Sequence, residues 1–334
     1  MTAPTYDLGK LHGGLRLPAH KRDATANAIL EIPLPAQLVL PLEQHAGQPA
    51  QPIVDIGSRV LKGQVIAKPD GDMGVPVHAS SSGTVVAIES RPVSRRFGDS
   101  APCIVIECDG RDEPISDRQY EDSLAMPPAD LLLHILDGGI AGLGGAVFPT
   151  AQKLMQASTV RTQHLILNGV ECEPYISCDD MLMREHAEAV VGGARILLHA
   201  LQAEICYIAV ESDKPEALSS LGAILASVGD ERIVLKQVPT IYPSGGEDQL
   251  VQLVMNVEVP SGGLPTDVGC VVQNVGTAAA VHDWVSNGEP RISRVTTVTG
   301  DGIDAPINGR ARIGTPIADV VGSIGGYRDQ PQHL

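Results

Sequence analysis

Residues 138–153 read Gly-Gly-Ile-Ala-Gly-Leu-Gly-Gly-Ala-Val-Phe-Pro-Thr-Ala-Gln-Lys, and five of the first eight are glycine. Glycine allows the backbone to turn at positive φ and to approach a ligand closely, because it has no Cβ. Pro149 suits the first turn of a helix, whose free N–H groups would join those of the loop in an anion site, with Lys153 adding a charge. The segment therefore predicts a phosphate cradle for a nucleotide or a flavin. A tight loop packed against the core is the alternative.

The loop matches neither of the two common phosphate-binding motifs. A P-loop ends in Gly-Lys-Ser or Gly-Lys-Thr, and this chain contains neither tripeptide. A dinucleotide-binding fingerprint directly follows a strand, whereas residues 129–137 (ADLLLHILD) have the pattern of a helix. The sequence of the loop on its own therefore does not identify a ligand.

Composition bounds the class of protein. The chain has 334 residues, enough for two or three domains, and 43% of them are hydrophobic, which allows a sizeable core. Its net charge of −16 argues against nucleic-acid binding, which needs a basic face. The six cysteines include no Cys-x-x-Cys pair, so we expect free thiols and no zinc or iron–sulfur site built from this chain. We recognise no signal peptide and no apolar run of bilayer length, so any membrane association is expected to be peripheral.

Changes in sequence pattern divide the chain into five expected parts. Turn residues and proline separate regions of strand-like pattern from regions where helical and strand-like patterns alternate. The parts are an extended arm (1–30), a domain of short strands (31–110), a charged, proline-bearing linker (111–130), an α/β domain (131–290) and a second β-like segment (291–334).

The region of short strands resembles the barrel-sandwich fold of biotinyl and lipoyl carrier domains. Two hairpin-like units carry the resemblance, residues 53–67 and residues 75–88. Carrier domains present a modified lysine at a hairpin tip, but Lys68 lacks the Met-Lys-Met or Asp-Lys-Ala context of those proteins. We therefore expect a docking or structural role for this domain, with a carrier role as the alternative.

The alternating pattern after the glycine loop predicts a largely parallel sheet with covering helices. Ligands of such sheets bind at the carboxyl ends of the strands. Either Asp179 or Asp180 is the expected N-cap of the first long helix. The expected strands are 164–168, 205–210 and 232–238, and the expected helices are 180–201 and 215–228.

Three polar clusters lie next to expected strands and helices. They are Asn168, Glu171 and Glu173, then Tyr242, Glu247 and Asp248, and then Asn274 and Thr277. An amide suits the edge of a flavin ring, carboxylates suit ribose hydroxyls or a carboxamide, an aromatic ring suits adenine, and helix-capping residues suit phosphate. Taken singly, each cluster is a weak signal. The structural alternatives are a solvated acidic turn, which spacing alone favours for the first cluster, a first helical turn for the second and a cap for the third.

In series, the glycine loop and the three clusters resemble the flavin- and NADH-binding subunit of respiratory complex I. That family reads Gly-Arg-Gly-Gly-Ala-Gly-Phe-Pro-Thr-Gly-x-Lys, Asn-x-Asp-Glu-x-Glu-Pro, Tyr-x-Cys-Gly-Glu-Glu and Asn-Asn-Val-Glu-Thr. The variants at 144–150 (GGAVFPT), 168–175 (NGVECEPY) and 260–269 (PSGGLPTDVG), together with the barrel-sandwich region, are more similar to the C subunit of the Rnf complex, a ferredoxin:NAD⁺ oxidoreductase. The resemblance covers essentially the whole chain. It implies a Rossmann-like FMN/NADH core at 131–290 and the start of a β-grasp (SLBB) domain at 291–334.

The resemblance also implies a role for each residue of the series. FMN would contact Gly142, Gly144, Gly145, Lys153, Asn168, Glu171, Asn274 and Thr277, and NADH would contact Phe148, Glu173, Tyr242 and Glu247. Asn168 would lie at the isoalloxazine ring, and Asn274 and Thr277 at the ribityl phosphate. Hydride transfer needs no general acid or base, so we assign binding roles and expect no catalytic side chain and no metal ligand.

The implied function is that of an FMN-dependent NADH:acceptor oxidoreductase of the translocase type. It would exchange a hydride between NAD(H) and FMN and pass single electrons onward. Expected partners are NADH, the membrane and iron–sulfur subunits of the Rnf complex and, indirectly, ferredoxin, at the cytoplasmic side of the inner membrane. [4Fe-4S] clusters are expected only in the family's C-terminal domain, whose Cys-x-x-Cys-x-x-Cys-x-x-x-Cys-Pro runs are missing from this sequence. We therefore expect a truncated chain or a lost domain.

Three substitutions depart from the complex I pattern. Leu143 replaces an arginine, Val170 an aspartate and Gly246 one of two paired glutamates. The loop is therefore expected to hold its ligand mainly through backbone N–H groups and Lys153. The alternative function is a scaffold that binds no flavin, as in the A subunit of the sodium-pumping NADH:quinone reductase, which shares this architecture. The direction of electron flow and the pumped ion stay open.

Overall fold

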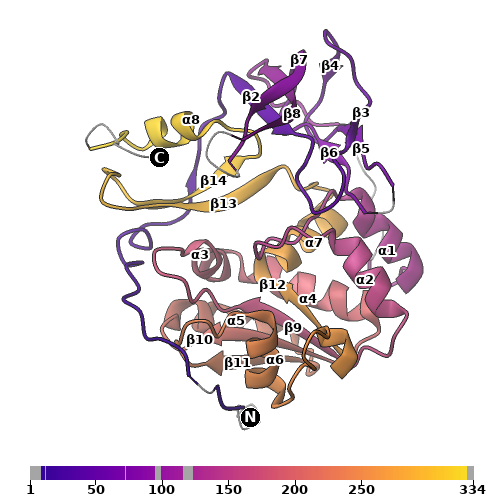
Figure 1. Cartoon of the computed structure of the whole chain (residues 1–334), viewed down its shortest axis with the longest axis vertical. Helices are drawn as coiled ribbons and strands as arrows, with labels where there is room; N and C mark the ends of the chain where they lie inside the picture. Colours follow the sequence, from indigo (N-terminus) through magenta and orange to yellow (C-terminus); the bar gives the residue numbers. More distant parts are fainter. Residues whose placement is uncertain (1–8, 12, 72, 95–98, 116–122, 329–334) are drawn as a thin grey trace.

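The computed structural model describes residues 9–11, 13–71, 73–94, 99–115 and 123–328. Figure 1 shows two lobes. The strands before residue 109 and the elements of residues 293–323 form one lobe, and the helices and strands of residues 128–287 form the other.

Two small antiparallel sheets with a common core make up the first lobe. One has the strand order β2 (Gln37–Pro41), β8 (Ser100–Cys108), β7 (Gly83–Pro92) and β4 (Arg59–Val60), and the other has the order β3 (Gln51–Pro52), β5 (Val65–Lys68) and β6 (Val77–His78). Alternate side chains of β2 and β8, among them Leu38, Leu40, Ile104 and Ile106, are buried against Ile66 of the other sheet. This confirms the barrel-sandwich architecture predicted from the sequence.

A four-stranded parallel sheet forms the centre of the second lobe. Its strand order is β11 (Ile233–Val238), β10 (Ile205–Glu211), β9 (His164–Gly169) and β12 (Cys270–Asn274). Successive side chains of β9 alternate between two cores, since Leu165 and Leu167 lie in one and Ile166 in the other. The parallel α/β architecture predicted from the sequence is confirmed.

Helices cover both faces of this sheet. They are α1 (Pro128–Asp137), α2 (Thr150–Ser158), α3 (Cys178–Glu185), α4 (Ala187–Leu201), α5 (Pro215–Val228), α6 (Glu247–Met255) and α7 (Val275–Asn287), with a short 3₁₀ turn at Pro265–Val268. Leu250 and Val254 of α6 pack on the face that includes Ile166. Helices α1, α2, α4, α5 and α7 pack on the opposite face.

The single helix predicted over residues 180–201 is wrong. Helix α3 ends at Glu185 and α4 begins at Ala187, because His186 leaves the helical conformation, with φ −126° and ψ 35°. The break has no local signal, since neither glycine nor proline occurs between residues 180 and 191. It lets α3 contact α5 while α4 packs along α7. The predicted N-cap is also wrong, because α3 begins at Cys178, with Ser177 in the cap position.

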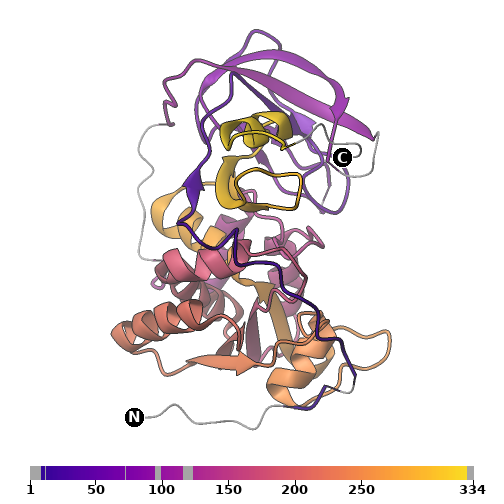
Figure 2. The ribbon, with the colours of Figure 1, turned by 90° about the vertical axis from the view of Figure 1, so that its left-hand side faces the viewer.

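The chain returns to β structure after α7. Strands β13 (Ser293–Val298) and β14 (Ile307–Arg312) are antiparallel, β1 (Leu30–Glu31) pairs in parallel with β14, and α8 (Ile317–Ser323) follows. The described part of residues 9–29 runs across the α/β lobe (Figure 2), where Leu15 pairs with Tyr242. Within the expected linker, residues 116–122 lie outside the described residues. Among the described helices, none is long and apolar enough to cross a membrane.

Candidate functional site

The candidate site lies where the strand order of the parallel sheet reverses. The chain passes from β9 to β10 on one side, whereas β12 joins β9 on the other side. Asn168 and Asn274 are direct neighbours in the register of β9 and β12, and both lie at the carboxyl ends of their strands. The crevice outside such a reversal is the usual ligand site of an open α/β sheet. The topology thus brings the first and third polar clusters together.

The glycine loop packs against the N-terminus of α7 at this crevice. The amide of Leu143 donates to Oγ1 of Thr277 at 2.9 Å. A Cβ on Gly144 would lie 3.3 Å from Cβ of Asn274, which is a tight contact. Gly145 has φ +102°, a conformation that side-chain-bearing residues rarely adopt. The structure therefore places the loop and the 274–277 segment together, as the site prediction requires.

Three consecutive amides of the loop are available to a ligand. Within the described part of the chain, the N–H groups of Gly144, Gly145 and Ala146 donate to no protein acceptor, and these residues are exposed. A hydrogen bond between the Gly142 amide and the Phe148 carbonyl, 2.8 Å long, closes the loop around them. Exposed amides beside a helix N-terminus are suited to an anion such as a phosphate.

Asn274 and Thr277 are engaged in holding this arrangement. Oδ1 of Asn274 caps α7 by accepting from the amides of Gly276 at 2.8 Å and Thr277 at 3.3 Å. Its Nδ2 donates to Asp179 Oδ2 at 2.6 Å. Thr277 is fully buried, and its hydroxyl accepts from the Leu143 amide. In this structure the Asn274 side chain caps α7, and the Thr277 side chain holds the glycine loop through the Leu143 amide.

Lys153 and Glu247 lie against each other. Lys153 Nζ donates to Glu247 Oε1 at 2.7 Å and to the carbonyl of Val272 at 2.8 Å. The contact joins α2 to the start of α6 and to β12. A residue predicted to bind FMN and one predicted to bind NADH therefore share one edge of the crevice. Both side chains are about one-third exposed or more, so a ligand can reach them.

Asn168 ties the end of β9 to the segment before α6. Its Nδ2 donates to the carbonyl of Gly245 at 2.9 Å, and its Oδ1 accepts from the amide of Val170 at 3.0 Å. Tyr242 pairs through its backbone with Leu15 of the N-terminal arm, and 37% of it is exposed. Glu173 is exposed and Phe148 is half-buried. The side chains predicted to bind NADH therefore lie at the rim of the crevice, where a ligand can reach them.

Glu171 is buried beneath the site. Its Oε1 accepts from the Asp179 amide at 2.9 Å, and its Oε2 accepts from the Asp180 amide at 3.3 Å. It thereby supplies the carboxylate that caps α3, a task that sequence rules assign to Asp179 or Asp180. Burial, with the neighbouring Asp179 carboxylate as the next cause, raises the pKa of Glu171 to about 7.

A group of potential cation ligands lies around Glu171. Glu171, Cys178 and Asp179 each offer a ligand atom, and these atoms lie within 4.8 Å of one another. Burial raises the pKa of all three groups, although the hydrogen bond from Asn274 opposes this for Asp179. Protons therefore compete strongly with a metal ion at these atoms.

Sequence reasoning missed a buried ion pair at the end of β10. Lys214 Nζ contacts the Glu211 carboxylate, and both side chains are almost inaccessible to solvent. Glu211 directly follows the apolar strand predicted at 205–210, a position that could have signalled a site residue.

Sequence reasoning also missed Arg294, whose Nη2 donates to the carbonyl of Leu143 at 2.9 Å. Nothing local marks Arg294, because its partner lies 151 residues away.

Two family models match the chain. Residues 9–111 match the RnfC barrel sandwich hybrid domain, and residues 135–283 match the Nuo51 FMN-binding domain. The C subunit of the ion-translocating oxidoreductase complex of Pseudomonas aeruginosa is 48% identical over 313 residues, which cover 94% of this chain and 40% of that protein. The protein of the same name from Rhodobacter capsulatus is 39% identical over 326 residues, covering 97% of this chain and 62% of that protein. The chain thus spans about two-fifths to three-fifths of the length of these relatives.

A solved structure shares the fold. A chain of the NAD⁺-reducing [NiFe]-hydrogenase in the H2-reduced state superposes with a TM-score of 0.54 at 24% identity. The match covers 61% of this chain and 40% of that chain. At this level of identity the likeness concerns the fold alone.

Proposed function

Because the chain belongs to the family of C subunits of ion-translocating oxidoreductase complexes, we propose that it binds FMN and NAD(H) and transfers a hydride between them. One observation carries the proposal most directly. The region that matches an FMN-binding domain, residues 135–283, contains the strand-order reversal with the exposed glycine-loop amides beside it.

The residues present fit a flavin phosphate. The amides of residues 144–146 offer hydrogen-bond donors, and the N-terminus of α7, whose first amides are capped by Asn274, adds a favourable dipole. Lys153 contributes a positive charge, which the phosphate would share with Glu247. Bound FMN would supply the hydride chemistry, and the chain would orient the two cofactors and exclude water. Phe148, Glu173 and Tyr242 at the rim are the proposed contacts of NADH.

The proposed partners follow from the family. Electrons would pass from this subunit to iron–sulfur and membrane subunits of the complex and, indirectly, to or from ferredoxin, with the chain docked peripherally on the cytoplasmic face of the inner membrane. Clusters are proposed to lie outside this chain. The six cysteines here have no cluster spacing, and burial is the main cause that raises the pKa of each thiol, which disfavours ligation.

A scaffold without flavin is the second candidate function. Its support is that the protein itself engages the side chains of Asn168, Glu171, Asn274 and Thr277. In addition, Lys153 is already paired with Glu247. On this interpretation the crevice is a packed junction, and the protein only docks its partners.

Flavin binding followed by reduction separates the two candidates. The purified chain would be mixed with FMN, freed of excess flavin and examined by visible absorbance before and after addition of NADH without oxygen. About one FMN per chain, bleached by NADH, is the result expected for the dehydrogenase function. FMN that stays bound but unreduced would remove the hydride-transfer proposal. A chain that retains no FMN would support the scaffold.

A further inference from the structure

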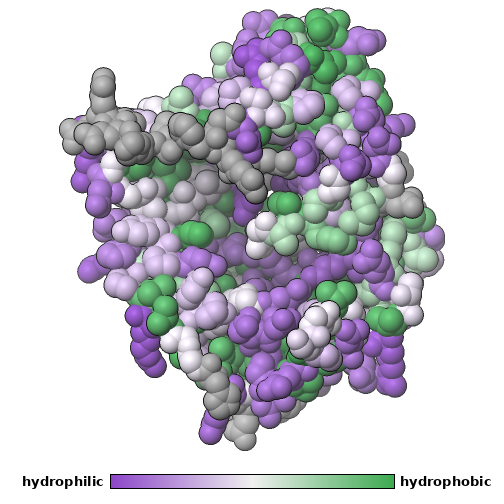
Figure 3. Space-filling view, in the orientation of Figure 1, coloured by the Kyte–Doolittle hydropathy of each residue, from purple (hydrophilic) through white to green (hydrophobic). Residues whose placement is uncertain are grey.

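A second cavity lies between the lobes, away from Lys153, Asn168 and Glu247. It encloses about 750 Å³, a volume in the range of small-molecule sites. Its walls come from α3, α4 and α7, from residues 62–63 and 114–115 of the first lobe, and from the β13–β14 hairpin with the segment before it. Figure 3 shows hydrophilic residues gathered where the surface is hollowed between the lobes.

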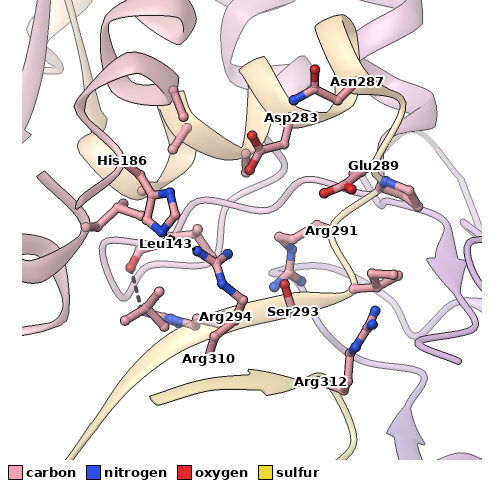
Figure 4. Close-up of a pocket in the computed structure, with 18 of the residues that line it drawn as sticks. Leu143, His186, Asp283, Asn287, Glu289, Arg291, Ser293, Arg294, Arg310 and Arg312 are labelled. Atoms are coloured by element: carbon pink, nitrogen blue, oxygen red, sulfur yellow. Dashed lines mark hydrogen bonds between the residues drawn. The ribbon is translucent and has the colours of Figure 1, made fainter. Parts of the chain in front are cut away.

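The two sides of this cavity differ in charge (Figure 4). Arg291, Arg294, Arg310 and Arg312 lie along the β13–β14 side together with Ser293. Asp283, Asn287 and Glu289 lie across the cavity, at the end of α7 and just beyond it. Four arginines in one wall are unexpected in a chain of net charge −16. The general field of such a chain repels anions, so an anion could bind only at a built site.

Part of the positive charge is compensated within the protein. Arg310 Nε contacts Glu31 at 3.0 Å, and Arg312 contacts Asp112 at 2.7 Å. Lys62 contacts the same Asp112 oxygen at 2.8 Å, so two cations share one carboxylate. These contacts leave the wall with more cations than paired carboxylates.

Among the described residues, neither Arg291 nor Arg294 forms an ion pair with a carboxylate, although the charge of Arg294 opposes the rise that burial causes in the pKa of Asp179 in the cavity wall. Arg291 donates to the carbonyl of Gly139 and to Gln44 Oε1, each at 3.3 Å. Arg294 donates to the carbonyl of Leu143 at 2.9 Å. Burial, followed by the charge of Arg294, lowers the pKa of Arg291 to about 10. Two neighbouring guanidiniums held on neutral acceptors are an arrangement that a bound anion would stabilise.

We propose that this cavity binds a phosphorylated small molecule of nucleotide size, with its phosphate on Arg291 and Arg294. Guanidinium groups match phosphate oxygens in pairs, and Ser293 beside them offers a hydroxyl donor. The carboxylates of Asp283 and Glu289 accept hydrogen bonds from hydroxyl or amino groups at the other end of the molecule. A bare inorganic anion would fill only a small part of this volume, which favours a larger molecule as the complete ligand.

This site borders the flavin crevice and shares part of its wall, because Leu143, Asp179 and Gly276 also line the cavity. The carbonyl of Leu143 accepts from Arg294 in the cavity, and its amide donates to Thr277 in the crevice wall. A phosphate that takes the guanidinium of Arg294 competes with the Leu143 carbonyl. Occupancy of the cavity therefore alters one of the ties that hold the glycine loop.

Isothermal titration calorimetry of the purified chain with ADP and with inorganic pyrophosphate tests the proposal. Arg294→Gln is expected to weaken binding of both probes about tenfold or more, which is the loss of one charge-assisted hydrogen bond. Arg294 is exposed, so this variant should keep the fold, and its thermal unfolding would be measured as a check. Arg161→Gln, at an arginine 80% exposed and outside the cavity, is the matched control and should leave affinity unchanged.

Two further variants distinguish this site from the flavin crevice and test the acidic wall. These titrations are made with the chain saturated with FMN, so that the amides of residues 144–146 and Lys153 are already occupied. Lys153→Ala should then leave pyrophosphate affinity unchanged, whereas loss of binding in Lys153→Ala with retention in Arg294→Gln would overturn the proposal. ADP should bind more tightly than pyrophosphate, and Asp283→Asn should remove most of that difference. Equal affinity for the two probes, or no binding at millimolar concentration, would also overturn it. FMN reduction by NADH is measured separately, so failure here leaves the proposed function standing.

Discussion

The carboxyl group of Glu171 should make the stability of the protein depend on pH in an unusual direction. Burial raises its pKa from the ordinary value of 4.5 to about 7, so the folded chain binds a proton that the unfolded chain releases between these pH values. The protonated form therefore contributes stability that is complete below about pH 4.5 and is lost as the pH rises through about 7. The difference between 4.5 and about 7 corresponds to about 3 to 4 kcal/mol at most, since one pKa unit is about 1.4 kcal/mol.

Urea unfolding at several pH values from 4.5 to 8 would measure this contribution. Glu171→Gln keeps an oxygen acceptor for the Asp179 amide and cannot ionise, so its stability relative to the wild type should rise by up to about 3 to 4 kcal/mol across that range. Taking the difference between the two proteins removes the titration of other groups. Glu258→Gln, at an exposed carboxylate, is the control and should show no such change. Parallel pH profiles for wild type and Glu171→Gln would refute the reasoning.

Three other variants test the candidate site. Lys153→Ala should weaken FMN binding about tenfold in a flavin-fluorescence titration, because one charge-assisted contact is lost; unchanged affinity would mean that the phosphate lies elsewhere. Asn274→Ala should cost about 1 kcal/mol, typical of a lost N-cap, and lower the midpoint of thermal unfolding by a few degrees; an unchanged midpoint would argue against the cap. Gly145→Ala should destabilise the loop by about 1 kcal/mol through its positive φ and weaken FMN binding; wild-type flavin affinity would show that the loop geometry is not needed.

The elements that surround the site were predictable where local pattern decides the structure. The apolar segments at 164–168 and 205–210 became the central strands β9 and β10, and the polar residues after the first of them lie at the carboxyl edge, as expected for a parallel sheet. The proximity of the glycine loop to residues 274–277, by contrast, could not be predicted from local pattern. More than 120 residues separate them, so only the resemblance to a known family, and no spacing rule, placed them together.

The features that sequence reasoning missed all depend on distant partners. Helix α3 is capped by Glu171 from the preceding loop, whereas local capping rules select a residue next to the helix. The break at His186 coincides with a contact from Arg310, whose Nη2 lies 2.7 Å from His186 Nε2. Because a guanidinium only donates, His186 must accept, which requires its neutral form. Burial and Arg310 accordingly lower its pKa. Tertiary contacts therefore overrode a continuous helical pattern.

At the crevice, some side chains hold the protein together, whereas the loop amides and Lys153 can be reached by a ligand. Mutations in these two groups should therefore have different effects. Asn168, Asn274 and Thr277 hold the strand ends and the loop in place through bonds within the protein. What remains for a phosphate is the run of amides at 144–146 and the charge of Lys153. Because these donors are already fixed by the tied side chains, the proposed flavin would bind with little ordering of the protein. Loss of a tie should therefore appear first in thermal stability, whereas loss of Lys153 should appear in flavin affinity with the fold unchanged.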